Sequence, residues 1–254
     1  MTAPAFTVNI QKGGALLPDA RRLVEVWDLS DTADANLRRV ADDNLLGKTT
    51  RRRLDDVLLR CLVPRFVAPG PHVIAALKQL LADHRAFVEA AYYETSRDER
   101  LLAAFAEGPC FEWYQAGRSR VTIEGAMSWL GEQAAAGVLP EWSPTVRTKV
   151  GRGLLAALRD FGVLEGATLK RFAAPQLSLR GFAYVAFRLH EQGASSTTVV
   201  TSSVWRRWLL DSVRVEDLLH QAARAGLLTY GSAGTAIRID WHVASVEEAI
   251  RVAA

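Results

Sequence analysis

The chain has 254 residues, of which about half (49%) are hydrophobic, so it is long enough for two domains and apolar enough for a substantial core. Its formal net charge is only +3 although its pI is near 9.0, which is compatible with a nucleic-acid partner without requiring one. No apolar run approaches the roughly 20 residues of a membrane span. No secretory signal opens the chain either, so a cytoplasmic protein without a membrane partner is expected.

The first part of the chain, residues 1–115, has the spacing of a helical bundle. Apolar residues recur every three to four positions, and proline or glycine separates the segments. Pro64 should end one helix and Gly108–Pro109 another, because proline lacks a backbone N–H and its ring clashes with the preceding turn. Helices joined by short loops pack as a bundle. The helices are expected over residues 16–28, 32–46, 49–63, 73–83, 85–95 and 98–107.

A basic run lies near the start of the third of these helices. Residues 47–50 (Gly-Lys-Thr-Thr) resemble the end of a phosphate-binding P-loop, but Asp42 stands where that motif needs its first glycine, so nucleotide hydrolysis is not expected. Three arginines follow directly: Arg51, Arg52 and Arg53. Cations at a helix start oppose the helix dipole unless an anion offsets them. That anion could be a nucleic-acid phosphate, or it could be the neighbouring Asp55 and Asp56.

No catalytic or metal-binding arrangement stands out in the sequence. Cys61 and Cys110 lie far apart among apolar neighbours, which predicts buried free thiols in a reducing compartment. The five histidines have no metal-ligand spacing, and neither a nucleophile elbow nor a Gly-x-Gly-x-x-Gly turn is present. The sequence therefore predicts a binding protein, not an enzyme, with no metal and no small-molecule cofactor.

The pattern changes near residues 110–120, after which helices alternate with short strands, and this change suggests a domain boundary. The best-marked helix begins after Ser143, a good N-cap, with Pro144 at the first helical position, where its missing N–H costs nothing. Gly162 should end this helix, because glycine accepts the left-handed conformation. A β-hairpin is expected next. A helix followed by a hairpin is typical of a winged helix, in which the helix can enter a DNA groove.

The helix after Ser143 is amphipathic and has a basic face. Its apolar residues at helical spacing form one stripe: Val146, Val150, Leu154, Leu158 and Phe161. At about 100° per residue, its cations fall on or near the opposite face. The cations of this helix and of the expected hairpin are Lys149, Arg152, Arg159, Lys170 and Arg171. They form a predicted DNA-binding surface, although an ordinary surface helix with solvated charges has the same pattern.

The last part of the chain repeats the order of helix, glycine and hairpin. Residues 154, 155, 162 and 164 have the same type as residues 218, 219, 226 and 228, at a constant offset of 64. Trp205 and Trp208 flank two arginines, as base-stacking residues sometimes do, but their helical spacing favours a place in the core. A hairpin over 227–241 and a closing helix over 246–252 are expected. The predicted organisation is mainly α: a helical bundle over 1–115, a winged-helix module over 118–180 and a second such module over 181–254.

Several short motifs resemble the BrxA family of bacterial BREX phage-exclusion systems. One group is residues 43–46 (Asp-Asn-Leu-Leu), 48–54 (Lys-Thr-Thr-Arg-Arg-Arg-Leu) and 59–62 (Leu-Arg-Cys-Leu). Another is residues 142–145 (Trp-Ser-Pro-Thr), followed by 154–158 (Leu-Leu-Ala-Ala-Leu) and 161–164 (Phe-Gly-Val-Leu). The resemblance implies a bundle like the NusB antitermination fold, a winged-helix C-terminal part, DNA binding, and service in phage defence beside a methyltransferase, an ATPase and other proteins.

Three hypotheses about function follow from these patterns. The first is a non-enzymatic DNA-binding component of a phage-defence system, which contacts double-stranded DNA mainly through phosphates and works beside other defence proteins. The second is a protein-interaction scaffold whose basic residues balance acidic neighbours, as the low net charge of +3 suggests. The third is an RNA-binding or transcription-regulatory protein that acts through the N-terminal bundle. The motifs behind the resemblance are structural and do not choose between them.

Overall fold

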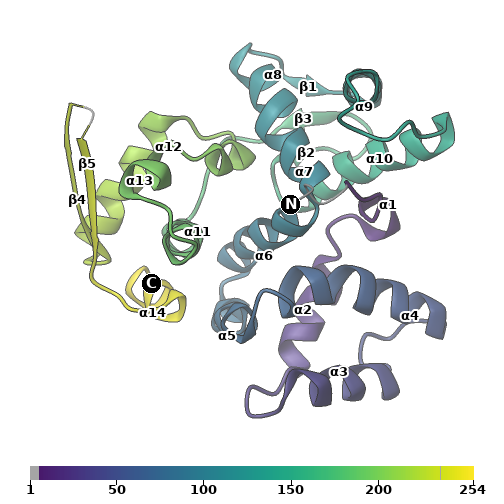
Figure 1. The fold of residues 1–254 in the computed structure, drawn as a ribbon, viewed down its shortest axis with the longest axis horizontal. Coiled ribbons are helices and arrows are strands. Elements are labelled where there is room, and N and C mark those ends of the chain that lie inside the picture. The colour runs from purple at the N-terminus through teal and green to yellow at the C-terminus, as the bar shows by residue number, and fades with distance from the viewer. Residues whose placement is uncertain (1–5, 235) are drawn as a thin grey trace.

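Helices make up most of the chain in the computed structural model, which describes residues 6–234 and 236–254. Figure 1 shows three groups of elements: N-terminal helices, a second group with a small three-stranded sheet, and a third group that includes a long hairpin. Their buried residues form one continuous hydrophobic core that includes residues from Ile10 to Ala253. The mainly α fold with small antiparallel sheets is as predicted.

The first group consists of helices, most of them close to those expected from the apolar spacing, whereas the short α1 and α8 were not predicted. Thr32, Thr50 and Asp83 each accept a backbone N–H at a helix start, as residues with side-chain oxygens do. The elements are α1 (Ile10–Gly13), α2 (Leu17–Val26), α3 (Ala33–Asp42), α4 (Arg51–Val57), η1 (Leu58–Val67), α5 (Pro71–Gln79), η2 (Leu80–Ala82), α6 (His84–Asp98), α7 (Arg100–Phe105), η3 (Ala106–Cys110) and α8 (Phe111–Gln115).

Pro64 and Pro109 do not end their helices, and that prediction is wrong. Each proline lies inside a π-helix that continues the preceding α-helix, Pro64 in η1 and Pro109 in η3. The wider turn of a π-helix moves the preceding carbonyl groups away from the pyrrolidine ring, which relieves the clash that ends an α-helix. Core packing favours the continuation, because Leu62 and Phe66 on η1 are fully buried.

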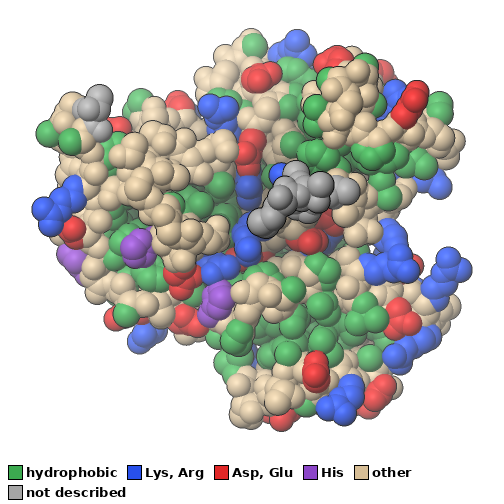
Figure 2. All heavy atoms as spheres, in the orientation of Figure 1, with side chains coloured by type: hydrophobic (Ala, Val, Ile, Leu, Met, Phe, Trp, Pro, Cys, Tyr) green, Lys and Arg blue, Asp and Glu red, His purple; other side chains and the backbone are tan. Residues whose placement is uncertain are grey.

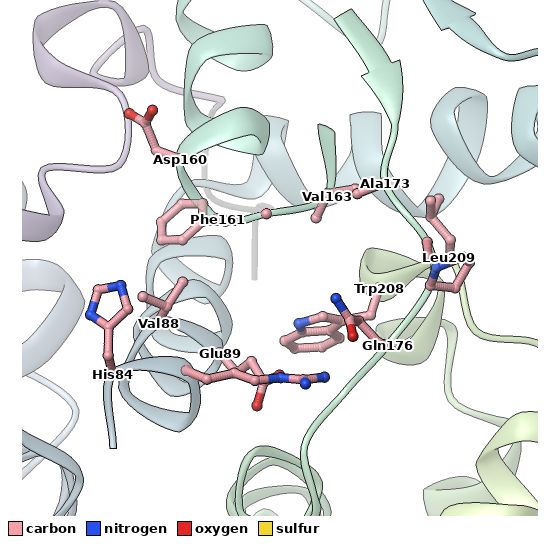
Figure 3. Close-up of a pocket in the computed structure, with 14 residues that line it drawn as sticks. His84, Val88, Glu89, Asp160, Phe161, Val163, Ala173, Gln176, Trp208 and Leu209 are labelled. Carbon is pink, nitrogen blue, oxygen red and sulfur yellow. The ribbon is translucent and has the colours of Figure 1, made fainter. Parts of the chain in front are cut away.

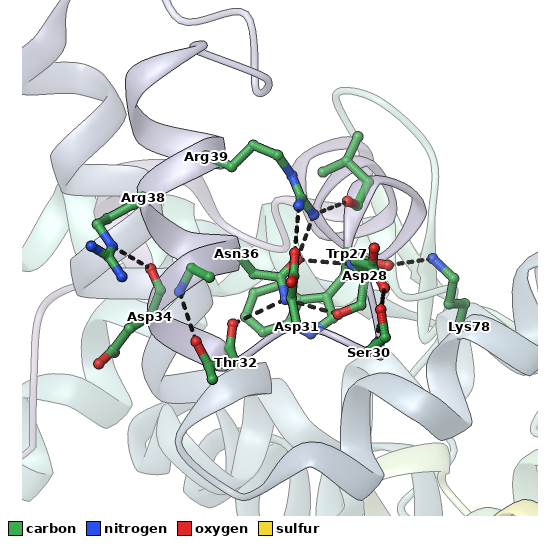
Figure 4. A network of polar contacts seen from close by, with 12 residues as sticks. Trp27, Asp28, Ser30, Asp31, Thr32, Asp34, Asn36, Arg38, Arg39 and Lys78 are labelled. Carbon is green, nitrogen blue, oxygen red and sulfur yellow. Dashed lines mark hydrogen bonds and ion pairs between the residues drawn. The ribbon is translucent and has the colours of Figure 1, made fainter.

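A buried amide fixes the loop between α2 and α3. The side chain of Asn36 accepts the backbone N–H of Asp28 at 2.8 Å and donates to the carbonyls of Asp28 and Thr32 at 2.8 and 3.1 Å (Figure 4). Arg39 donates to the Asn36 side-chain oxygen at 2.6 Å and pairs with Asp31 at 2.9 Å. Arg39 is therefore held by groups within the chain.

The second group combines two helices with a small sheet. The sheet is antiparallel in the order β1-β3-β2, so the first strand pairs with the far strand of the hairpin. The hairpin was predicted, but the first strand was not, because two residues are too few to show an alternating pattern. The elements are β1 (Arg120–Val121), α9 (Ile123–Ala135), α10 (Pro144–Asp160), β2 (Leu164–Glu165) and β3 (Lys170–Phe172).

Helix α1 packs directly on α10, although the two are far apart in the sequence. Gly153 permits this approach, since a Cβ atom there would lie 2.8 Å from the carbonyl oxygen of Ile10. Ile10 is itself fully buried. The contact joins the predicted segments 1–115 and 118–180 through their backbones, and the boundaries between the segments stay a prediction.

The third group begins with α11, which packs on α6. Its last helix, α14, packs against α5 and α11 and so ties the C-terminal part to the first group. Trp205 and Trp208 are buried, as predicted, on a 3₁₀-helix. The elements are α11 (Leu179–Glu191), α12 (Ser196–Thr201), η4 (Ser203–Trp208), α13 (Ser212–Arg224), β4 (Leu228–Ala233), β5 (Ala236–Trp241) and α14 (Val246–Val252).

The two helix–glycine–hairpin units share local backbone structure as well as the sequence offset. Gly162 and Gly226 have positive φ angles of 79° and 81°. The N–H of Gly162 donates to the carbonyl of Arg159 at 3.0 Å, and that of Gly226 donates to the carbonyl of Ala223 at 3.0 Å. The two helices related by the offset of 64 residues therefore end in the same backbone conformation, with the same hydrogen bond.

Within residues 6–234 and 236–254, no single helix is long and apolar enough to cross a membrane. The segments Arg51–Val67 and Pro71–Ala82 together have the length and apolar composition of a membrane span, but a bend of 87° separates them. Both halves contribute buried residues to the core, including Leu62 and Leu77.

Candidate nucleic-acid interface

Helix α10 is held at both ends by the residues predicted to define it. The hydroxyl of Ser143 accepts the N–H of Val146 at 3.4 Å, and Pro144 lies in the first turn. Gly162 follows the last turn with a positive φ of 79°. The buried residues of the apolar stripe are Val150, Leu154, Leu158 and Phe161. Their burial fixes the opposite face of α10 toward solvent.

Three predicted cations, Lys149, Arg152 and Arg159, are exposed on α10. The guanidinium of Arg159 lies 2.6 Å from the carboxylate of Asp160, so a neighbour offsets its charge. Lys149 and Arg152 make no ion pair with any residue that the structure describes. The outward face of α10 therefore carries two positive charges that no carboxylate among the described residues compensates.

The hairpin places its two predicted cations on opposite faces. Lys170 lies opposite the buried Val121, and its ammonium donates to a carbonyl within the hairpin at 3.0 Å. Arg171 lies opposite Arg120 on one side and Glu165 on the other. Successive side chains of a strand point to opposite faces, so Arg171 shares a face with Arg120 and not with Lys170. Glu165 offsets part of the charge of Arg171, but the directly opposed Arg120 and Arg171 leave this face with a net positive charge.

A hollow of about 380 Å³ lies between α10, the hairpin and the start of α9. Arg120, Arg152 and Lys170 line it, together with a single acid, Glu124. The structure thus brings together Arg152 and Lys170, which come from separate elements. Arg120, which the sequence analysis missed, borders the same hollow but lies on the sheet face of Arg171. The only signal for Arg120 was the short polar-apolar pair that it forms with Val121, which is too short to identify a strand.

The cations of this surface lack carboxylate partners, as do some arginines elsewhere, such as Arg38, Arg52 and Arg214, among the described residues. Many arginines elsewhere have carboxylate partners, among them Arg21, Arg39, Arg85, Arg97 and Arg180. In the described part of the chain, by contrast, no ion pair is formed by Arg120, Lys149, Arg152 or Arg171. Uncompensated cations on neighbouring elements create a positive potential that attracts an anion.

Of the three arginines at the start of α4, only Arg51 has a carboxylate partner among the described residues. Arg51 lies 3.1 Å from Asp55 and 3.9 Å from Asp42, whereas Arg52 is exposed and Arg53 is half-buried. Figure 2 shows Lys and Arg side chains at the right-hand edge of the molecule, over α3 and α4, with Asp and Glu among them. Internal pairing accounts for Arg51 without a phosphate.

The described residues include two buried cysteines and no cluster of metal-ligand side chains. No group of three or more His, Cys, Asp or Glu residues that could hold a metal ion occurs in the part of the chain that the structure describes. Cys61 and Cys110 are buried free thiols, as predicted. Burial raises the pKa of both thiols, and the protonated thiol is a poor nucleophile.

Comparison with known proteins identifies the family. The family model of BrxA matches residues 4–188. The chain belongs to the BrxA family. This BrxA chain is also similar to the crystal structure of an uncharacterized protein from Magnetospirillum magneticum, with a TM-score of 0.61 and 17% identity over 81% of this chain and 98% of that chain. At that identity the likeness shows the fold alone. No curated protein matches the chain.

The BrxA match covers every element of the candidate interface. It begins before α1 and ends inside α11, so β1, α10 and the β2–β3 hairpin all lie within it. Membership of the BrxA family implies a component of a BREX phage-defence system, for which other defence proteins are plausible partners. Residues 189–254, which include the β4–β5 hairpin and α14, lie beyond the match.

Proposed function

We propose that this BrxA protein is a non-enzymatic, cytoplasmic component of its BREX system that binds duplex DNA mainly through phosphates. Helix α10 lies along a groove, and the β2–β3 hairpin contacts the adjoining backbone. The observation that carries the proposal is that Arg120, Lys149, Arg152 and Arg171 lie on neighbouring elements, and none of the four has a carboxylate partner among the described residues. Phosphate oxygens suit such cations, and arginine above all.

The order of elements supports a winged-helix assignment for residues 118–180. A strand, two helices and a hairpin follow one another, and the strand completes the sheet on the hairpin. In helix-turn-helix proteins the second helix faces the DNA, and α10 is the second helix here. Residues 1–115 then correspond to the NusB-like bundle that the family resemblance implies.

Equilibrium binding of the whole chain to a fluorescent duplex, over a series of salt concentrations, tests the proposal. Each phosphate contact contributes roughly 0.9 to the slope of log affinity against log salt, so four contacts predict a negative slope of about 3 to 4. A duplex of scrambled sequence should compete almost equally well, and a structured RNA of equal length should compete less well. A flat salt dependence, or no binding at low salt, would overturn the proposal.

A protein-interaction scaffold is the second candidate. Leu169, at the tip of the hairpin, is 58% exposed and lines the same hollow as Arg152. An apolar side chain beside an arginine suits a protein partner as well as a nucleic acid. Co-purification with other BREX proteins that survives nuclease treatment, together with an absence of duplex binding, would favour this function over the first.

A further inference from the structure

A second hollow, separate from the proposed DNA interface, lies where the three groups of elements meet. Its volume is about 270 Å³, and α6, the end of α10, the segment between β3 and α11, and the end of η4 line it. Figure 3 shows Val88 and Phe161 on one side of this hollow and Trp208 and Leu209 on the other. No cation of the proposed DNA-binding surface lines it.

The indole N–H of Trp208 is buried and has no hydrogen-bond partner among residues 6–234 and 236–254. Trp208 is 4% exposed, and its side chain lies at the wall of the hollow (Figure 3). Trp205 lies in the same helix but donates its indole N–H to the carbonyl of Val199 at 2.6 Å. A buried donor without an acceptor is unfavourable, and no acceptor for the indole N–H of Trp208 is found in the described part of the chain, so an acceptor on a ligand would stabilise it.

The charged side chains around the hollow compensate one another. The carboxylate of Glu89 accepts the backbone N–H of Ser178 and the guanidinium of Arg85, each at 3.0 Å, and also the Ser178 hydroxyl. Asp160 is paired with Arg159. Because burying an unpaired charge is costly, these surroundings favour a neutral ligand over an ionic one.

The aromatic walls favour a flat ligand. Trp208 lies edge-on to Tyr92 with ring centroids 5.1 Å apart, and Phe161 stacks on the same tyrosine at 4.6 Å. The volume of about 270 Å³ is small for a ligand pocket and suits one or two fused rings. We propose that the hollow binds a small, neutral, planar heterocycle whose carbonyl oxygen or ring nitrogen accepts the indole N–H of Trp208.

Such a ligand contacts several elements that lie far apart in the sequence. Phe161 and Gly162 end α10, Pro175 lies on the link to α11, and Val88 belongs to α6. A ligand that touches all of these holds the end of α10 against the N-terminal helices. Binding to the folded chain alone also raises the unfolding temperature by mass action.

Two probes of similar size test this site in the whole chain. Nicotinamide is a neutral ring with a carbonyl acceptor, and toluene is a ring without one. In protein with nitrogen-labelled tryptophan, NMR separates the indole N–H signals of the seven tryptophans. The signal of Trp208, identified by its loss in Trp208→Phe, should shift saturably with nicotinamide, whereas the signal of Trp205 should not move.

The Trp208→Phe variant keeps an aromatic wall but removes the donor. It should bind nicotinamide about tenfold more weakly, the loss expected for one neutral hydrogen bond, and bind toluene with unchanged affinity. Trp113→Phe, which alters a tryptophan outside the hollow, is the matched control and should change neither affinity. Val88→Phe fills the hollow from α6 and should abolish binding of both probes, which keeps the test open if Trp208→Phe does not fold.

Three results would overturn the proposal. The first is a Trp208 signal that nicotinamide does not move at any soluble concentration. The second is an equal affinity of nicotinamide for the parent and the folded Trp208→Phe variant. The third is nicotinamide binding that persists in a folded Val88→Phe variant.

Discussion

Arg65 and Glu99 form an ion pair whose side chains are 0% and 1% exposed, with 2.9 Å between the guanidinium and the carboxylate. Arg65 also donates to the carbonyl of Gly14 at 3.3 Å. Removing one partner leaves an uncompensated charge in the core. Arg65→Met should therefore lower the free energy of unfolding by about 3–5 kcal/mol, as measured by urea denaturation.

The double variant Arg65→Met/Glu99→Leu is the control for that prediction. It removes both buried charges and replaces them with apolar side chains of similar size. It should be more stable than Arg65→Met, because the cost lies in the orphaned carboxylate and not in the loss of the pair itself. A double variant that is less stable than the single one would contradict this account.

Burial also controls the protonation of Glu89. Desolvation raises the pKa of its carboxyl group above the ordinary value of 4.5, although hydrogen bonds from Ser178 and Arg85 oppose the shift. The folded chain then binds this proton more tightly than the unfolded chain, so the free energy of unfolding should fall as pH rises from 4.5 to the raised pKa. Urea denaturation at a series of pH values should show a flatter profile for Glu89→Gln, and an unchanged profile for the exposed Glu124→Gln. A steeper fall in Glu89→Gln would show that the sign is wrong.

At the scale of elements, the contact between α1 and α10 depends on a glycine. In an ordinary helix, Gly→Ala stabilises by about 0.5–1 kcal/mol. At Gly153 the added Cβ would lie 2.8 Å from the backbone carbonyl oxygen of Ile10, so Gly153→Ala should instead lower the melting temperature. Gly131→Ala is the matched control, because its Cβ would meet only the flexible end of Arg147, at 3.2 Å. Equal stabilisation by both substitutions would contradict the close approach of the two helices.

The sequence analysis predicted those elements whose ends and buried faces depend on residues close together in the chain. Ser143 and Gly162 define the ends of α10, and the apolar stripe between them identifies its buried face. The π-helix at Pro64 was not predictable in this way, because buried contacts of η1 with other helices outweigh the usual effect of proline. The strand at Arg120 depends on pairing with Lys170 and Arg171, about 50 residues later, which no local pattern encodes.

The sequence analysis named individual residues of the candidate interface, but it did not show how their side chains lie relative to one another. Sequence spacing placed Arg152 on the outward face of α10, and Arg152 and Lys170 line the same hollow. The opposite orientation of Arg171 follows from the strand register, which depends on how the two-residue strands pair. The unpartnered indole of Trp208 had no sequence signal, because both tryptophans of η4 have the spacing of core residues.

For the whole molecule, the end of the family match at residue 188 does not mark a detachable part. Val246, Ala249 and Ile250 of α14 are buried, and that helix packs on α5 and α11. A chain shortened to residues 1–191 exposes those surfaces. We expect it to lose the cooperative thermal unfolding of the full chain or to aggregate, as measured by circular dichroism and gel filtration. A shortened chain that melts within a few degrees of the full chain would contradict the single core.

The most direct test of the proposed function compares two triple variants in duplex binding across a salt series. The first, Arg152→Ala/Lys170→Ala/Arg171→Ala, removes cations of α10 and the hairpin. The control removes three exposed arginines of α2, α3 and β5, through Arg22→Ala/Arg38→Ala/Arg238→Ala, and so changes the net charge equally.

The first variant should bind at least about tenfold more weakly, or about 1.4 kcal/mol, with a salt slope lower by roughly two to three units and an unchanged melting temperature. The control should keep the affinity to within about twofold and leave the salt slope unchanged, because its arginines lie on other elements. If the first variant stays folded and binds duplex DNA as well as the parent, α10 and its hairpin are not the DNA-binding surface.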